Sequence, residues 1–145
     1  MENMEKDLLE TIADIRGFMP GSAFNLRKNG EGVERHSTEH VKISAKTDKP
    51  GIDIRIDANT VGESIHIPVI LTESGIKDVV YNDFYIGENC DVEIIAGCGI
   101  HNDGCDTSQH DGIHTFHIGK NAKIVYSEKH VGEGNGSGER ILNPT

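Results

Sequence analysis

The 145-residue sequence contains no tryptophan, and aromatic residues make up only 5% of it. Its hydrophobic content of 35% is low for a globular protein, and its 17 glycines indicate many turns and thin layers. The shortage of aromatic side chains disfavours a sugar-binding groove, which usually presents tryptophan or tyrosine. The chain is still long enough to bury a core as one domain.

Basic residues and long apolar runs are also scarce. The 14 Lys and Arg are outnumbered by 24 Asp and Glu, so the net charge is −10. This balance argues against binding to nucleic acid or to an anionic membrane, whose phosphates attract Lys and Arg.

No apolar run approaches the roughly 20 residues that cross a bilayer, and there is no signal-type start. We therefore expect a cytoplasmic protein whose three cysteines are thiols, an odd number that favours metal binding or reactivity over disulfides.

Common catalytic motifs are missing too. The sequence has no phosphate-binding G-x-x-x-x-G-K-[ST] loop, no G-x-S-x-G nucleophile elbow and no H-E-x-x-H zinc motif. A glycosidase that uses paired carboxylates stays open on sequence grounds, because Asp and Glu are plentiful.

Residues 4–16 have helical periodicity, with Leu8, Ile12 and Ile15 on one face and Gly17 as the stop. We expect this amphipathic helix to dock on the rest of the protein or to contact a partner. Residues 1–20 would thus form a helix and linker, and residues 21–145 a β-domain. The expected strands are short runs bounded by Gly, Asn, Asp or Pro, at Val41–Ile43, Ile52–Ile56, Ser64–Leu71, Val79–Tyr81, Asp91–Ile95, Ile113–Ile118 and Lys123–Tyr126. Residues 140–145 resemble the start of another strand.

An internal repeat indicates how these strands are arranged. The pattern apolar-x-Ile-x-x-Asn occurs at residues 54–59, 84–89 and 116–121, with spacings of 30 and then 32 residues. Asparagine suits such a turn because it tolerates a positive φ and can hydrogen-bond to nearby backbone. The period favours a β-solenoid over three coincidental strand–turn units in a β-sandwich.

The repeat also predicts which side chains face inward. If Phe84, Ile86, Phe116 and Ile118 point inward, strand alternation places His114 inward and His117 outward. The register Val92 to Ile124 and Ile94 to Tyr126, continued along the strand, places Cys98 beside His130, about 4.8 Å apart on neighbouring strands.

Potential metal ligands are concentrated between Ala96 and His117, which holds two of the three cysteines and four of the eight histidines. Thiolate and imidazole are the side chains that bind transition metals. Cys98 and His101 have the Cys-x-x-His spacing that can chelate one metal through a tight turn. His110 and His114 add two imidazoles.

Each of these residues also has a simpler interpretation. Cys98 could be a small buried residue, His114 a hydrogen-bonded core histidine, and His101 and His110 solvated loop residues. Cys105 lies in the most polar part of the loop, and Cys90 is expected to be a small filler of the asparagine turn.

Six stretches resemble the compact SufB/SufD-like proteins, scaffold components of the SUF system of iron–sulfur cluster assembly. They are Pro50–Ile54, His66–Leu71, Tyr81–Gly87, Ala96–Asn102, His110–His114 and Glu128–His130. The resemblance implies a right-handed parallel β-helix, here preceded by the short helix. It also implies two partners, an ABC-type ATPase of the SufC kind and a second scaffold subunit. Family members are considerably longer, so the chain is expected to be a truncated portion of such a protein.

Three functions follow as hypotheses. The first is a scaffold that transiently holds iron or an iron–sulfur cluster through residues drawn from Cys98, His101, His110, His114 and His130. Three cysteines cannot supply a four-cysteine cluster, so histidine, another ligand or a second subunit must contribute. The second is a zinc or iron enzyme that uses the same donors. The third is a metal-free β-solenoid interaction module.

Overall fold

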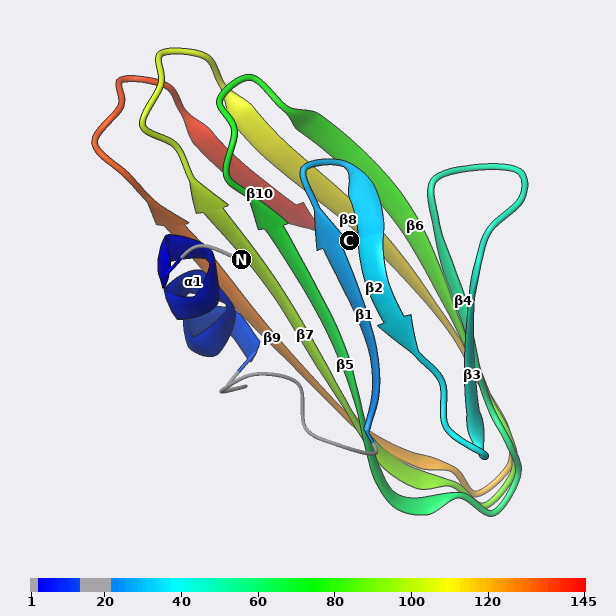
Figure 1. The fold of residues 1–145 in the computed structure, drawn as a ribbon. Coiled ribbons are helices and arrows are strands. Elements are labelled where there is room, and N and C mark those ends of the chain that lie inside the picture. The colour runs from blue at the N-terminus through cyan, green and yellow to red at the C-terminus, as the bar shows by residue number, and fades with distance from the viewer. Residues whose placement is uncertain (1–2, 14–21) are drawn as a thin grey trace.

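The computed structural model describes residues 3–13 and 22–145, which are mostly β-strand with one short helix, α1 (Asn3–Ala13). The strands form two five-stranded sheets, ordered β2-β1-β5-β7-β9 and β10-β8-β6-β4-β3, which face each other in Figure 1. The strands are β1 (Ala23–Lys28), β2 (Glu31–His36), β3 (Val41–Ala45), β4 (Gly51–Ile56), β5 (Val61–Leu71), β6 (Lys77–Ile86), β7 (Asp91–His101), β8 (Ser108–Ile118), β9 (Lys123–Glu133) and β10 (Arg140–Pro144).

The chain alternates between the two sheets from β4 to β10, so each strand pairs in parallel with the strand two steps away in sequence. The first two pairings differ, because β1 with β2 and β3 with β4 are antiparallel. Each predicted strand lies within one of the observed strands β3 to β10, although most observed strands are longer. The sequence did not predict β1 and β2.

The predicted repeat and its register are confirmed. Ile54 lies opposite Phe84, which lies opposite Phe116. The turn asparagines Asn59, Asn89 and Asn121 have φ angles of 67°, 59° and 59°. Their side chains form a ladder, in which Nδ2 of Asn89 donates to Oδ1 of Asn59 at 3.2 Å, and Nδ2 of Asn121 donates to Oδ1 of Asn89 at 3.5 Å. At this end of the strands the turns therefore stack one on another.

The loops at the opposite end are less uniform. The loop from β5 to β6 connects Leu71 to Lys77, and the loop from β7 to β8 connects their respective neighbours, Ile100 and Gln109. The second connection is three residues longer. At the asparagine end, a β-bulge between Val61 and Ser64 adds one residue to β5 after the first turn of the repeat.

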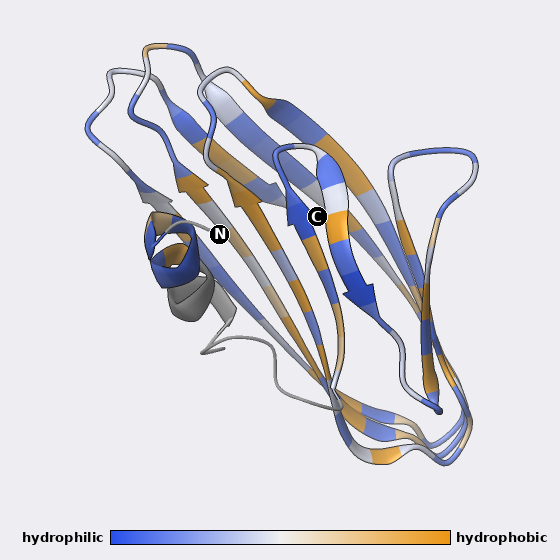
Figure 2. Cartoon of the chain, in the orientation of Figure 1, coloured by the Kyte–Doolittle hydropathy of each residue, from blue (hydrophilic) through white to orange (hydrophobic). Residues whose placement is uncertain are grey.

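The apolar core lies between the sheets at the asparagine end. Figure 2 shows the alternation of apolar and polar residues along the strands that creates it. Phe84 is fully buried, and its ring stacks on that of Phe116 with centroids 4.7 Å apart. Ile118 has the inward register that the sequence predicted, yet it is 58% exposed because β10 pairs only with the first part of β8.

Helix α1 packs on the outside of the β5–β7–β9 sheet (Figure 1). Leu8 is 2% exposed, and a Cβ at Gly99 would lie 2.6 Å from its Cδ1, so the glycine makes room for the helix. Glu5 and Lys28 form an ion pair at 2.6 Å. Docking is thus the observed role of the Leu8 face, while residues 14–16 of the predicted helix and its stop, Gly17, lie outside the described residues. No helix in the described part is long and apolar enough to span a membrane.

The asparagine ladder gives the first prediction. Replacing Asn89 by Ala should lower the free energy of unfolding by about 1–2 kcal/mol, because an alanine at positive φ is strained. Asn89→Gly keeps the backbone conformation without strain, so it should be more stable than Asn89→Ala by about 1 kcal/mol. Urea denaturation of the two variants measures this difference. Equal stabilities would show that the left-handed turn does not constrain residue 89.

Candidate functional site

Cys98 and His130 are directly paired neighbours on β7 and β9, as the repeat predicted. Cys98 is 3% exposed. Burial raises the pKa of its thiol well above the ordinary value, and the negative charges of Asp78 and Glu128 raise it further. Cys98 is therefore a protonated thiol at neutral pH, and any metal that it binds must displace this proton.

The two imidazoles of β8 lie across from Cys98, on the other sheet. The simpler interpretation of His110 as a solvated loop residue is wrong, because His110 is part of the strand and only 6% exposed. A Cβ at Gly112 would lie 3.2 Å from Nε2 of His114 and 3.5 Å from Nε2 of His110. The glycine between them therefore gives both rings room on the same side of the strand.

Glu128 on β9 lies between His130 of its own sheet and His114 of the facing sheet, and contacts both. Its carboxylate oxygens lie 3.4 Å from Nε2 of His114 and 3.2 Å from Nε2 of His130. Burial opposes its ionisation, but hydrogen bonds from Tyr126 and His130 hold the pKa of Glu128 below its usual value. Burial lowers the pKa of His114, despite the nearby Glu128 charge. The result is a carboxylate beside a neutral imidazole.

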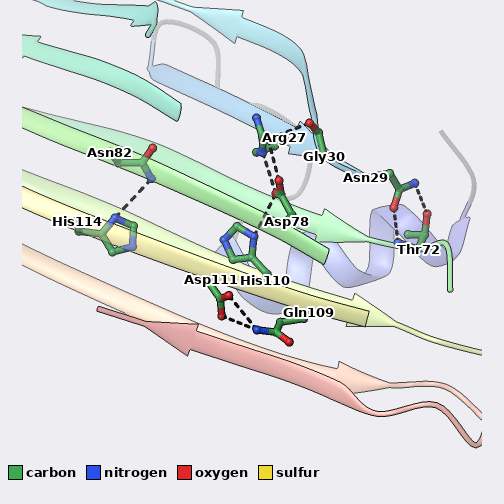
Figure 3. A network of polar contacts seen from close by, with 10 residues as sticks. All are labelled: Arg27, Asn29, Gly30, Thr72, Asp78, Asn82, Gln109, His110, Asp111 and His114. Carbon is green, nitrogen blue, oxygen red and sulfur yellow. Dashed lines mark hydrogen bonds and ion pairs between the residues drawn. The ribbon is translucent and has the colours of Figure 1, made fainter. Parts of the chain in front are cut away.

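A buried polar network formed by Asp78 and Arg27 holds the Nδ1 side of His110 (Figure 3). Both oxygens of Asp78 accept hydrogen bonds from Arg27, each at 2.8 Å, and Nδ1 of His110 lies 3.2 Å from Oδ2 of Asp78. Burial disfavours a charged Asp78, but Arg27 and then His110 hold the pKa of that carboxyl well below its usual range. The network fixes the His110 ring so that its other nitrogen, Nε2, is left for a ligand.

Sequence reasoning missed Asp78, Arg27 and Asn82. The repeat could have predicted two of them. Asp78 and Asn82 on β6 are paired with His110 and His114 on β8, each 32 residues further along the chain. Side-chain nitrogen Nδ2 of Asn82 lies 3.4 Å from Nδ1 of His114 (Figure 3). The same 32-residue offset that placed Cys98 beside His130 would have found both pairs.

Four of the five predicted site residues line one cavity between the sheets. Cys98, His110, His114 and His130 surround it together with Glu128, and apolar walls come from residues such as Ile67 and Val69. Its volume is about 20 Å³, which is enough for one water molecule and hence for a single ion of similar size. We call it the Cys98 cavity.

His101 does not belong to this cavity. The tight turn expected between Cys98 and His101 is absent, because both residues lie within strand β7, where residues three apart point to opposite faces. His101 instead pairs with Asp103, at 2.7 Å from Nε2, and with Glu133, at 3.3 Å from Nδ1. These carboxylates, Asp103 above all, raise the pKa of His101.

Neither of the other two cysteines lines the Cys98 cavity. Cys90 is 1% exposed in the asparagine turn, as expected of a small filler, and its thiol donates to the carbonyl of Asp57 at 3.0 Å. Cys105 is exposed in the loop after β7. His117, predicted to face outward, is 48% exposed and stacks on Tyr85.

The donor set fits a single metal ion better than a cluster. One thiol, three imidazoles and one carboxylate are the chemistry of zinc and iron sites. A four-cysteine cluster does not fit, because Cys98 is the one cysteine that lines the cavity. Within residues 3–13 and 22–145, no three His, Cys, Asp or Glu side chains form a ready-made metal site. Binding would require Glu128 and His130 to exchange their mutual hydrogen bond for the metal.

Removing the carboxylate of Asp78 should destabilise the fold. Asp78→Asn leaves the Arg27 guanidinium, whose side chain is 15% exposed, without its partner, at a cost of about 3 kcal/mol. Asp53→Asn is the matched control, because Lys46 keeps Asp83, and should cost less than about 1 kcal/mol. Chemical denaturation compares the two. A loss in Asp78→Asn no larger than in the control would contradict the structural role of the network.

The His101 ion pairs should make stability depend on pH. Because the folded-state pKa of His101 is raised above the unfolded value of about 6.5, their stabilisation is complete below that value and is lost as pH rises through the folded-state pKa. Urea midpoints of the wild type and His101→Gln should therefore differ most below about pH 6.5 and converge as the pH rises through the folded-state pKa. Parallel pH profiles would rule out this contribution.

Comparisons of the chain with protein-family models, with curated proteins and with solved structures found no match. The functional interpretation therefore depends on the geometry of the Cys98 cavity and on the sequence resemblance.

Proposed function

We propose that this chain is a scaffold component of cytoplasmic iron–sulfur cluster assembly, on which iron or a cluster is built or briefly held. The observation that carries the proposal is the convergence of Cys98, His110, His114 and His130 with Glu128 on one cavity between two sheets. The cluster is the cargo in this function, so a site that binds it weakly is suited to releasing it.

The architecture supports the same proposal. Parallel strands that alternate between two sheets, with a repeat of 30 to 32 residues, are expected of a right-handed parallel β-helix. That is the fold implied by the SufB/SufD resemblance. The resemblance also supplies the proposed partners, an ABC-type ATPase of the SufC kind and a second scaffold subunit.

The cavity assigns distinct roles to its residues. Cys98 would provide the thiolate, and His130 beside it a nitrogen ligand from the same sheet. His110, oriented by Asp78, and His114 would contribute from the facing sheet. Glu128, a carboxylate in the same cavity, would add an oxygen ligand, and the proton that Cys98 must release would pass to solvent. A complete cluster would require additional ligands from a second subunit.

A second candidate is an enzyme that uses one zinc or iron ion. It is favoured by the small volume of the Cys98 cavity and by the single thiol in it. With three protein ligands, such an ion would keep one position open for water.

Anaerobic reconstitution with iron and sulfide tests the proposal. The wild type should take up both and develop visible absorbance, which Cys98→Ser should lose. Cys105→Ser, which changes an exposed cysteine, is the matched control and should behave as the wild type. Uptake of metal without sulfide would favour the single-ion enzyme. Equal absorbance in the wild type and Cys98→Ser would remove Cys98 as a ligand.

A further inference from the structure

A second and larger cavity lies near the hairpins β1–β2 and β3–β4, away from the asparagine turns. Its volume is about 350 Å³, which is within the range of small-molecule sites. Residues from both hairpins and from β5 and β6 line it. We call it the hairpin cavity. It shares Ile67, Val69 and Asn82 with the Cys98 cavity but contains none of the predicted metal ligands.

The apolar residues of the hairpin cavity come from both sheets. The buried ones are Ile52, Ile67, Val69 and Val80, which are 1–8% exposed. We call these four residues the apolar floor. Such a surface can bind hydrocarbon, with a gain proportional to the apolar area removed from water.

The remaining lining is rich in cations, which is unusual for a chain with a net charge of −10. Four of its 14 basic residues line this cavity: Arg27, Arg35, Lys46 and Lys49. Two of them are neutralised by carboxylates. Arg27 forms a bidentate pair with Asp78, and Lys46 lies 2.6 Å from an oxygen of Asp53 and 2.6 Å from one of Asp83.

The other two cations, Arg35 and Lys49, have neutral partners. Nε of Arg35 donates to Oδ1 of Asn25 at 2.8 Å, and Nζ of Lys49 lies 4.7 Å from the centre of the Tyr81 ring. Across residues 3–13 and 22–145, neither makes an ion pair with a carboxylate. Their partners thus orient the two positive charges without cancelling them. We call Arg35 and Lys49 the cationic pair.

From this juxtaposition we propose that the hairpin cavity binds a small organic anion. The cationic pair holds its carboxylate or phosphate group, and the apolar floor holds its hydrocarbon part. Charge-assisted hydrogen bonds from a guanidinium and an ammonium suit either head group. The side-chain amides of Asn25 and Asn82, which also line the cavity, provide neutral hydrogen-bonding groups. The proposal does not depend on iron or sulfide.

Titration of the ¹⁵N-labelled full chain with phenyl phosphate tests the site. The side-chain amide signals of Asn25 and Asn82 should shift, while those of the turn asparagines Asn59, Asn89 and Asn121 should stay in place. Inorganic phosphate should bind at least tenfold more weakly, because it leaves the apolar floor uncovered. Phenylacetate provides the carboxylate alternative, and the tighter of the two aromatic ligands identifies the preferred head group. If neither of them shifts Asn25 or Asn82, the proposal is wrong.

A charge-matched pair of variants tests the assignment of residues. Arg35→Gln/Lys49→Gln should weaken phenyl phosphate binding at least tenfold. The control Lys42→Gln/Arg55→Gln removes two positive charges outside the cavity lining and should leave the affinity within about twofold. Thermal unfolding establishes that both variants are folded at the assay temperature. An equal loss in both variants would overturn the proposal, because it would indicate only the effect of net charge. Single substitutions provide the same comparison if either double variant unfolds.

Discussion

The parallel stacking of equivalent residues is the constraint on which the rest of this structure depends. Asparagine at each turn takes the left-handed conformation, so the chain reverses into the other sheet at the same place in every copy. Since the strands then pair in register, a residue lies beside its equivalent 29 to 32 positions away. The Phe84–Phe116 stack, the Cys98–His130 pair and the Asp78–His110 contact all follow from this rule.

The space between the sheets has two chemically different ends. Near the asparagine turns it is filled by apolar side chains such as Ile54, Phe84 and Ile94. Toward the other end the sheets are linked by polar contacts, from Arg27 on β1 to Asp78 on β6, and from Glu128 on β9 to His114 on β8. Apolar packing is tolerant of small adjustments, whereas buried charges require their partners. The polar end is therefore the more sharply specified of the two, and both cavities border it.

The sequence was most informative where the repeat was strict. It predicted the turn asparagines, the strands that follow them and the neighbourhood of Cys98 and His130, because a period and strand alternation suffice for these. It predicted neither β1 nor β2, and the reason is plain for β2, because Glu31–His36 is exposed along its length and has no apolar alternation. It misjudged His101 because Cys-x-x-His spacing indicates a chelate only in a turn, and the residues between lie in a strand. Arg27 could not be found at all, since it reaches Asp78 across 51 residues and outside the repeat.

The unequal loops opposite the asparagine turns have a consequence for how such a chain can change. At the asparagine end the turns touch through their side chains, and the one extra residue of β5 there is accommodated by the β-bulge between Val61 and Ser64. At the opposite end, the connection from β7 to β8 already carries three residues more than the connection from β5 to β6, with the pairing of β6 and β8 intact. The larger length variation is thus absorbed opposite the asparagine turns, so sequence diversity can accumulate there without altering the geometry of the Cys98 cavity.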